Sequence, residues 1–378
     1  MKIVIFGLSV TSTWGNGHGT TFRALLSALH RRGHQITFFE KDVEWYASNR
    51  DLPHPVFCHV QLYTDWNEVL PRVRREINDA DIAVVGSYFP DGIRALKEIA
   101  DSNAAVKAFY DIDTPITMAA LRQYGRTDYL DAWQIPQLDI YFSFTGGPML
   151  REIETSFGAR RAVPLYCSFD PEDYRRLPSN NRLACDLNYM GTYAPDRQPK
   201  LEELLCVPAT RLSDRKFIVA GPQYPSALRW PGNVEHIAHL SPVWHPGFYS
   251  SSRFTLNVTR RDMAMAGYSP SVRLFEAAAC GAAIVSDNWP GLDGFFRPGE
   301  EILLPTGSCD VVRYLTECSD QEARQIGENA QARVLAAHTS SHRALEFERE
   351  VERASSVGQA VTPAAPAMVD QLSSSASE

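Results

Sequence analysis

The sequence predicts an α/β protein made of two doubly wound domains. Short apolar strands alternate with helical stretches along the chain, a pattern typical of parallel sheets that are covered by helices. The chain has 378 residues, of which 44% are apolar, and this length exceeds what one hydrophobic core usually serves. We therefore expect two sheets that face each other, with a ligand cleft near the carboxyl ends of their strands.

The first series of elements opens as a βαβ unit. Residues 2–6 form an apolar strand, and a loop rich in Gly, Ser and Thr leads to a helical stretch at 20–32. Further strands are predicted at 35–39, 82–85, 106–110, 140–144 and 162–165, and further helices at 66–78 and 91–100.

The second series begins after the polar, proline-containing segment 170–181, where we expect the domain boundary. The predicted domains are thus 1–170 and 171–335. A C-terminal helix is expected at 336–353, within a charged, alanine-rich stretch, and a disordered tail at 354–378. Strands of the second domain are predicted at 187–190, 217–220, 234–237, 254–258, 283–286 and 302–304.

The overall composition limits the classes of function. A net charge of −8 argues against a protein that binds nucleic acid through counterion release, although nucleic acid as a substrate stays open. Seven cysteines without a Cys-x-x-Cys pair indicate reduced thiols and no metal site. The N-terminus lacks a signal-peptide pattern, and no apolar run reaches the length of a membrane helix, so we expect a cytoplasmic protein.

The most informative stretch is residues 269–287, which read as a loop, a short helix and a buried strand. We expect Ser269 to cap the helix and Gly281 to end it. The free N–H groups at the helix start favour a diphosphate. Arg273 and Glu276 lie three residues apart on one helix face, where they could hold phosphate and ribose. The alternative is a solvated ion pair, but the apolar flanks of Glu276 indicate a buried carboxylate that needs a partner.

The loop at 12–21 places three glycines and His18 between the first strand and its helix. The glycine spacing is G-x-G-x-G rather than G-x-G-x-x-G, so dinucleotide binding is disfavoured, and Glu40 at the end of the second strand is its only support. His18 is a candidate base or a donor to an acceptor or a phosphate; a capping or surface role is the alternative.

Two carboxylates, Asp111 and Asp113, close the strand at 106–110. As i and i+2 neighbours they are expected to point the same way, and one could orient or deprotonate an acceptor hydroxyl. Alternatively, one of them caps the following helix.

In the second domain, Gly191 and Thr192 follow a strand and allow a phosphate to approach closely, with Arg197 behind them as a cation or as an ordinary surface residue. Arg260 and Arg261 end another strand, and at least one of them should reach the same pocket.

Together these pieces resemble the two-domain glycosyltransferases of the GT-B fold, and among them the CgeB-like spore-maturation group. The resemblance covers about residues 1–340. It is carried by residues 15–18 with 32–34, by 110–115, by 189–193 with Arg197, and by 267–281.

The resemblance implies that Glu276 receives the ribose hydroxyls of a nucleoside diphosphate sugar with uridine as its base. The helix that starts near Ser271 would hold the diphosphate, together with Arg197 and either Arg260 or Arg273. The base would lie against residues 234–239, including His239. In related retaining families a Glu stands seven residues before this one, and here that position is Ser269.

The resemblance also implies that the first domain binds the acceptor, that no metal or other cofactor is needed, and that a C-terminal helix crosses back to the first domain. Asn16, Gly17 and Asp111 are the predicted acceptor-binding residues, and His18 and Asp113 the predicted catalytic ones.

The sequence therefore favours a glycosyltransferase that acts on a nucleoside diphosphate sugar and an unidentified acceptor, which could be a saccharide, lipid, protein, metabolite or modified nucleobase. A nucleotide-sugar epimerase or hydrolase, or a non-catalytic nucleotide-sugar-binding protein, could use the same scaffold.

Overall fold

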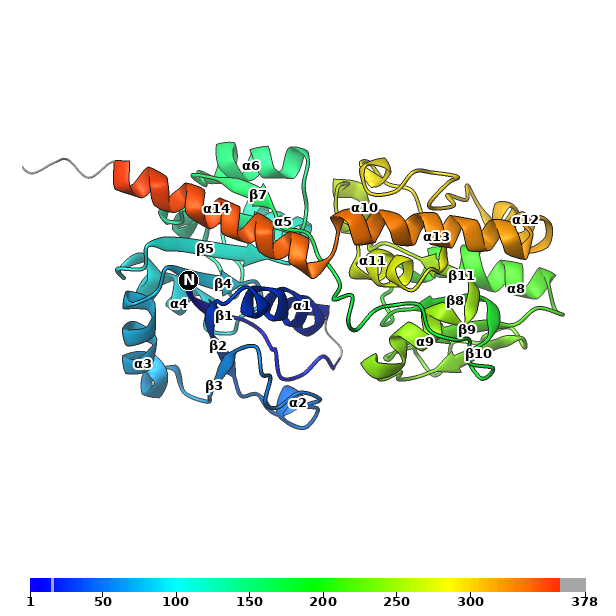
Figure 1. Cartoon of the computed structure of the whole chain (residues 1–378), viewed down its shortest axis with the longest axis horizontal. Helices are drawn as coiled ribbons and strands as arrows, with labels where there is room; N and C mark the ends of the chain where they lie inside the picture. The colour runs from blue at the N-terminus through cyan, green and yellow to red at the C-terminus, as the bar shows by residue number, and fades with distance from the viewer. Residues whose placement is uncertain (15–16, 361–378) are drawn as a thin grey trace, which may run out of the picture.

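The computed structural model describes residues 1–14 and 17–360, which form two α/β domains (Figure 1). The N-terminal domain has a seven-stranded parallel sheet in the order β3-β2-β1-β4-β5-β6-β7. The C-terminal domain has a five-stranded parallel sheet in the order β10-β9-β8-β11-β12. In each sheet the chain steps outward from the first strand, then returns past it to build the other half. This is the doubly wound topology, and the predicted fold class is confirmed.

The strands match most of the predicted ones within two residues. In the N-terminal sheet they are β1 (Lys2–Phe6), β2 (Gln35–Lys41), β3 (His59–Tyr63), β4 (Ile82–Gly86), β5 (Val106–Asp111), β6 (Ile140–Ser143) and β7 (Ala162–Pro164). In the C-terminal sheet they are β8 (Cys185–Met190), β9 (Phe217–Ala220), β10 (Val234–Ile237), β11 (Ser252–Asn257) and β12 (Ala283–Ser286).

Two strand predictions differ from the structure. The edge strand β3 was not predicted, because its alternating polar residues His59 and Gln61 give a weak apolar signal. Residues 302–304 form only isolated bridges, including one between Val285 and Leu303, and are not a strand.

The helices of the N-terminal domain are α1 (Gly17–Arg31), α2 (Glu44–Ala47), α3 (Trp66–Asn78), α4 (Gly92–Ala100), α5 (Thr114–Tyr124) and α6 (Pro148–Phe157), with a 3-10 turn η1 (Ala132–Gln137). Those of the C-terminal domain are α7 (Gln198–Leu201), α8 (Val207–Arg211), α9 (His245–Ser250), α10 (Arg261–Ala266), α11 (Val272–Ala279), α12 (Ser308–Glu317) and α13 (Asp320–Ala337). The C-terminal domain also contains a π-helical turn, η2 (Glu202–Cys206), and two 3-10 turns, η3 (Pro242–Trp244) and η4 (Leu292–Gly294). Within residues 1–14 and 17–360, no helix combines the length and the apolar character that a membrane span requires.

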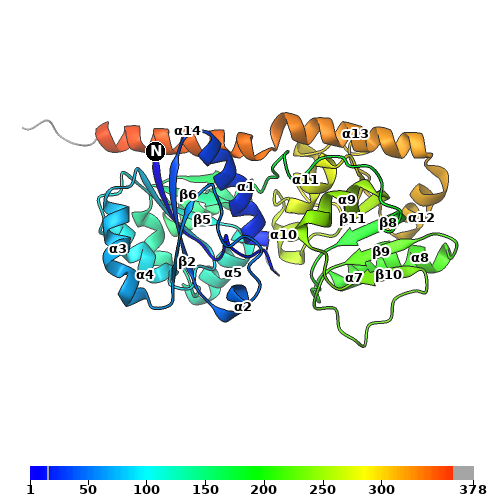
Figure 2. The same cartoon turned by 60° about the horizontal axis from the view of Figure 1, so that its bottom comes forward.

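A pair of C-terminal helices links the two domains (Figure 2). Helix α13 packs on α11 and β12, whereas α14 (Ser340–Ala360) crosses to the N-terminal domain and packs on α1. Glu348 of α14 accepts hydrogen bonds from Arg32 at 2.6 Å and pairs with His34 at 2.6 Å. The sequence predicted this crossing helix at residues 336–353. In the structure α14 begins at residue 340, after a break at residues 338–339, and ends at residue 360. The rest of the tail predicted to be disordered, residues 361–378, lies outside the described residues.

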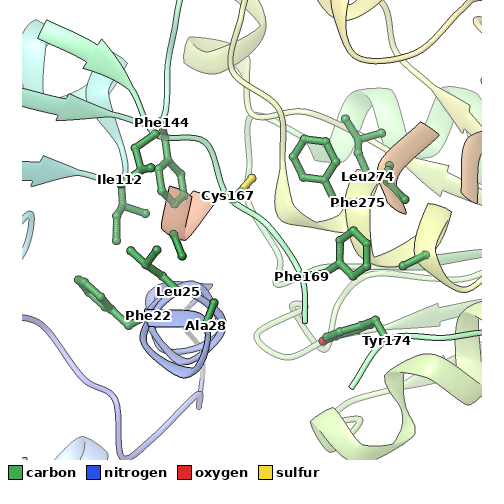
Figure 3. Close-up of a cluster of buried hydrophobic side chains, with 14 of the residues drawn as sticks. Phe22, Leu25, Ala28, Ile112, Phe144, Cys167, Phe169, Tyr174, Leu274 and Phe275 are labelled. Carbon is green, nitrogen blue, oxygen red and sulfur yellow. The ribbon is translucent and has the colours of Figure 1, made fainter. Parts of the chain in front are cut away.

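A single apolar cluster runs from the N-terminal sheet into the C-terminal domain (Figure 3). Phe22 and Leu25 of α1 belong to it, as does Phe275 of α11. Phe169 and Tyr174, on the segment that connects β7 with β8, are buried in the same cluster. The connection between the domains is therefore packed, and it limits how the two sheets can face each other.

Loops at the mouth of the cleft also bond the domains together. The N–H of Gly146 donates to the carbonyl of Tyr268 at 2.9 Å. Gly147 has φ 61°, and a Cβ there would lie 2.3 Å from the Tyr268 ring, so this position requires glycine.

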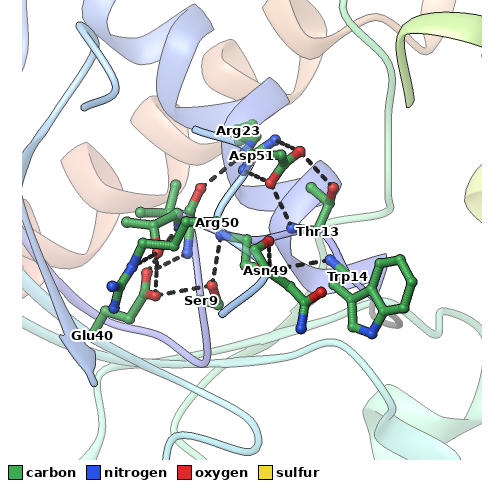
Figure 4. A network of polar contacts seen from close by, with 11 residues as sticks. Ser9, Thr13, Trp14, Arg23, Glu40, Asn49, Arg50 and Asp51 are labelled. Atoms are coloured by element: carbon green, nitrogen blue, oxygen red, sulfur yellow. Dashed lines mark hydrogen bonds and ion pairs between the residues drawn. The ribbon is translucent and has the colours of Figure 1, made fainter. Parts of the chain in front are cut away.

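Hydrogen bonds to Glu40 of β2 hold the loop after β1 in place (Figure 4). Its buried carboxylate accepts hydrogen bonds from Ser9 Oγ, the N–H of Val10 and both the N–H and Oγ1 of Thr11, at 2.6 to 3.0 Å. The carboxylate is thus occupied by the chain's own donors, which removes the one feature that supported dinucleotide binding.

We expect Glu40→Ala to lower the free energy of unfolding by about 3 kcal/mol, because it leaves buried N–H and O–H groups without an acceptor. Thermal and urea unfolding would measure this loss. Glu44→Ala, at the exposed start of α2, is the matched control and should lose less than about 1 kcal/mol. Equal losses in the two variants would contradict the role of Glu40.

Candidate functional site

The start of helix α11 lies two residues later than the sequence predicted. Ser271, rather than Ser269, is the residue that precedes the first turn. The Ser271 hydroxyl donates to Asn257 Oδ1 at 2.8 Å and not to the helix. Ser269 is buried, and its Oγ accepts a hydrogen bond from Thr145 of the N-terminal domain at 2.9 Å. The prediction that Ser269 caps the helix was therefore wrong, because its side chain instead accepts the hydrogen bond from Thr145 between the domains.

Glu276 lies on the second turn of α11 and is only 5% exposed. The hydroxyls of Tyr174 and Tyr249 donate to its carboxylate, the second at 3.4 Å. Burial raises the pKa of Glu276 to about 7, against these hydrogen bonds and the attraction of Arg273. Glu276 and Arg273 therefore do not form a solvated ion pair. The buried carboxylate has two tyrosines as its hydrogen-bond partners instead.

Arg273 is held beside the end of β8. Its Nε donates to the carbonyl of Met190, its Nη1 donates to Asn257 Oδ1 at 2.8 Å, and its guanidinium lies over the Tyr189 ring, 5.0 Å from the centroid. A Cβ on Gly191 would lie 2.9 Å from Arg273 Nη2, so this glycine leaves the guanidinium room.

Arg197 stands at the start of α7, near the same guanidinium. Its Nη2 donates to the carbonyl of Thr192 at 2.5 Å. Its Nε is buried and has no hydrogen-bond partner among the described residues. Burial lowers the pKa of Arg197, and the neighbouring charge of Arg273 adds to this effect. Two cations held close together favour an anion between them.

These groups surround a cavity of about 390 Å³ between the domains. The cavity therefore joins a helix start, two guanidiniums and a buried carboxylate. Seven of the nine residues predicted to bind the donor line it: Gly191, Thr192, Arg197, His239, Ser271, Arg273 and Glu276.

The N-terminal domain also contributes to this cavity, which the sequence did not indicate. Trp14 and Asp51 line it. The Trp14 ring lies 4.3 Å from the ring of His239 across the cleft. Asp51 accepts from the N–H and the hydroxyl of Thr13 at 3.0 and 2.8 Å and pairs with Arg23 at 2.8 Å, so the chain next to Trp14 is fixed (Figure 4).

A second cavity, of about 520 Å³, adjoins the first. His18, Asp113 and Arg260 line it, and so does Ser269. The two cavities adjoin, because they share five lining residues: Gly17, Thr192, Arg197, Ser271 and Val272.

His18 lies in the first turn of α1 and is 8% exposed. Its Nδ1 is buried without a hydrogen-bond partner among the described residues. The ring meets Tyr88 edge-on at 5.3 Å. Burial lowers the pKa of His18, while the charge of Asp113 opposes this shift, so a neutral imidazole faces a nearby carboxylate at pH 7.

The two carboxylates after β5 do not point the same way. Asp113 pairs with Arg260 across the cleft at 3.4 Å. Asp111 is fully buried, accepts from the hydroxyls of Tyr141 at 2.6 Å and Thr117 at 2.9 Å, and lines neither cavity. The strand ends at Asp111 and α5 begins at Thr114, so strand alternation no longer applies between the two residues.

Asp111 therefore has no exposed surface with which to touch an acceptor. Burial raises its pKa to about 7. Asn16, another residue predicted to bind the acceptor, lies outside the described residues, whereas Gly17 is exposed and lines both cavities.

Sequence reasoning missed several residues of the site. Trp14, Tyr88, Tyr174 and Tyr249 carried no recognisable motif. A tryptophan within the glycine-rich loop, Trp14, was the only available signal. Among residues 1–14 and 17–360, no group of three His, Cys, Asp or Glu side chains is arranged to hold a metal ion.

Comparisons with known proteins agree with this geometry. Residues 197–349 match the family described as Glycosyl transferase-like. This segment contains Arg197, Arg273 and Glu276. No curated protein matches the sequence.

Several solved structures are similar to this one over both domains. Sucrose-phosphate synthase from Thermosynechococcus elongatus has 12% identity and a TM-score of 0.66, over 94% of this chain and 100% of the other. Anabaena HepE, in complex with UDP and glucose, has 13% identity and a TM-score of 0.66, over 93% and 100%. An alpha-glucosyltransferase, in complex with UDP-glucose and DNA containing an abasic site, has 13% identity and a TM-score of 0.67, over 93% and 99%. The chain therefore has the GT-B fold, and its residues 197–349 are similar to the family described as Glycosyl transferase-like.

Proposed function

We propose that the protein is a glycosyltransferase that moves a sugar from a UDP-linked donor to a hydroxyl of an acceptor. One observation carries the proposal: a single cavity joins the start of α11, two half-buried guanidiniums and the buried carboxylate of Glu276, and it adjoins a second cavity lined by His18 and Asp113. The first cavity has the groups that a nucleoside diphosphate needs, and the second leaves room for an acceptor.

The donor is expected to lie with its diphosphate at the first turn of α11, between Arg197 and Arg273. The free N–H groups of that turn and the unpartnered Nε of Arg197 suit phosphate oxygens. Glu276 would accept hydrogen bonds from the ribose hydroxyls. His239 and Trp14 offer aromatic faces for the base.

The family match and the solved structures support this assignment. Two of the similar structures are complexes, one with UDP and glucose and the other with UDP-glucose. Membership of the CgeB-like group, uridine as the base and independence from metal are parts of the same proposal. The two arginines and the helix end would offset the charge of the departing diphosphate.

In the reaction, the acceptor oxygen forms a bond to the anomeric carbon of the sugar, and the bond between that carbon and the diphosphate oxygen breaks. UDP leaves with the bonding electron pair. The proton of the acceptor hydroxyl passes to His18, and the nearby charge of Asp113 stabilises the imidazolium. Arg260, paired with Asp113, fixes this carboxylate in place.

Glu276→Gln should weaken UDP binding by about 30-fold, because it removes a charged acceptor of the ribose hydroxyls while it keeps the side-chain volume. Isothermal titration with UDP measures the effect. We prefer Gln to Ala, since Ala would leave the Tyr249 hydroxyl without its acceptor and a void beside it. Glu317→Gln, an exposed change on α12 outside both cavities, is the control. Unchanged affinity in Glu276→Gln would refute the ribose contact.

The affinity for UDP-glucose should rise by about 10-fold between about pH 6 and about pH 8. In the free protein Glu276 has a pKa of about 7, and ribose hydroxyls that donate to it favour its ionised form. UDP-glucose is the suitable probe because its diphosphate has no terminal group that titrates in this range. The dependence should disappear in Glu276→Gln; the same slope in both proteins would count against the assignment.

His18→Gln should lower the rate of UDP release from UDP-glucose, with water as the acceptor, by about 100-fold or more. The affinity for UDP should stay within about 2-fold of the wild-type value, because His18 lines only the second cavity. Asp113→Asn should cause a smaller loss, since it removes only the charge beside the imidazole. His30→Gln, exposed at the other end of the same helix, is the control. Unchanged turnover in His18→Gln would exclude it as the base.

A further inference from the structure

The second cavity has a largely apolar wall. Ile112 and Phe144 line it from the N-terminal domain, and Val258 and Met263 from the C-terminal domain. Figure 3 shows Ile112 and Phe144 next to each other above α1. Each of these four side chains is at most 9% exposed, so the wall is made of core residues whose remaining surface faces the cavity.

Three of the hydroxyl groups in this wall already make hydrogen bonds within the protein. Ser271 donates to Asn257 Oδ1 at 2.8 Å, and Thr259 donates to Asp287 Oδ1 at 3.0 Å. Ser269 accepts from Thr145. These side chains therefore offer little hydrogen bonding to a bound molecule.

The polar groups that could meet a ligand gather at one end of the cavity. His18 has a buried Nδ1 without a partner among the described residues. Asp113 pairs with Arg260 and hydrogen-bonds Tyr88. This end adjoins the first cavity through Gly17 and Arg197, which line both.

We infer that the acceptor is a small hydroxyl compound with an apolar body, such as a phenol or an alicyclic alcohol. Its body would lie against Phe144, Ile112 and Met263, and its hydroxyl would reach His18 and Asp113. This inference rests on the proposed transferase function. It selects a small metabolite from the acceptor classes that the sequence left open.

The physical reason is the cost of unpaired hydroxyls. A saccharide would bring several hydroxyls into this wall, and each one buried without a partner costs about 1–3 kcal/mol. A ring or chain of carbon atoms gains about 25 cal/mol for each Å² that it buries. The cavity volume of about 520 Å³ suits one such molecule and not an extended polymer.

The test offers the full-length protein and UDP-glucose two acceptor panels at equal concentration: simple phenols with alicyclic alcohols, and neutral oligosaccharides. Mass spectrometry of the products and the rate of UDP release measure transfer, and titration with UDP is run in parallel. We expect glycosylated products from the first panel only.

A pair of variants tests the apolar wall directly. Met263→Gln keeps the side-chain volume but puts an amide into the wall, and it should raise KM for the best apolar acceptor by about 10-fold with UDP affinity unchanged. Met265→Gln, on the same helix α10 and 72% exposed, lies outside the cavity and should change neither value.

The outcomes separate the inference from the function on which it rests. Intact UDP binding with transfer to oligosaccharides alone, or to neither panel, would overturn the acceptor class. An equal KM in Met263→Gln and the wild type would also overturn it. Absence of UDP binding would instead reject the transferase proposal itself.

Discussion

The packed connection between the two domains is the constraint on which the candidate site depends. Neither cavity belongs to one domain, and each has walls from both domains. The buried Phe169 and Tyr174 tie the connecting segment to α11, while α14 binds the C-terminal end of the chain to α1. A shift of one domain would separate Trp14 from His239 and Asp113 from Arg260. The geometry of the site is therefore a property of the domain arrangement as well as of its residues.

Tyr174 shows how directly the connection and the site are coupled. It lies in the linking segment, packs in the shared apolar cluster and donates a hydrogen bond to Glu276. The Glu276 carboxylate in the first cavity is thus contacted by the segment that fixes the domains. The hydrogen bond from Thr145 to Ser269 is a second contact that joins the two domains at the cleft.

The charged side chains of the cleft differ in whether a side chain of opposite charge pairs with them. Arg197 and Arg273 are held by backbone carbonyls rather than by carboxylates, so their charge is available to an anion. Asp113 is instead neutralised by Arg260 across the cleft. The first cavity is consequently suited to a diphosphate, whereas the second is lined by the Asp113–Arg260 ion pair and the neutral imidazole of His18, with Arg197 where it adjoins the first.

The sequence alone determined the two α/β domains, because strand and helix periodicities are local, and it identified the helix that carries Arg273 and Glu276. It also predicted a crossing C-terminal helix by resemblance. Long-range packing decided the rest. Asp111 became buried because Tyr141 and Thr117 reach its carboxylate from other elements, while Asp113, two residues later, faces the cleft. Trp14 lines the first cavity beside His239 only because the two domains meet there. Such contacts join residues far apart in the chain, and no local pattern of residue types records them.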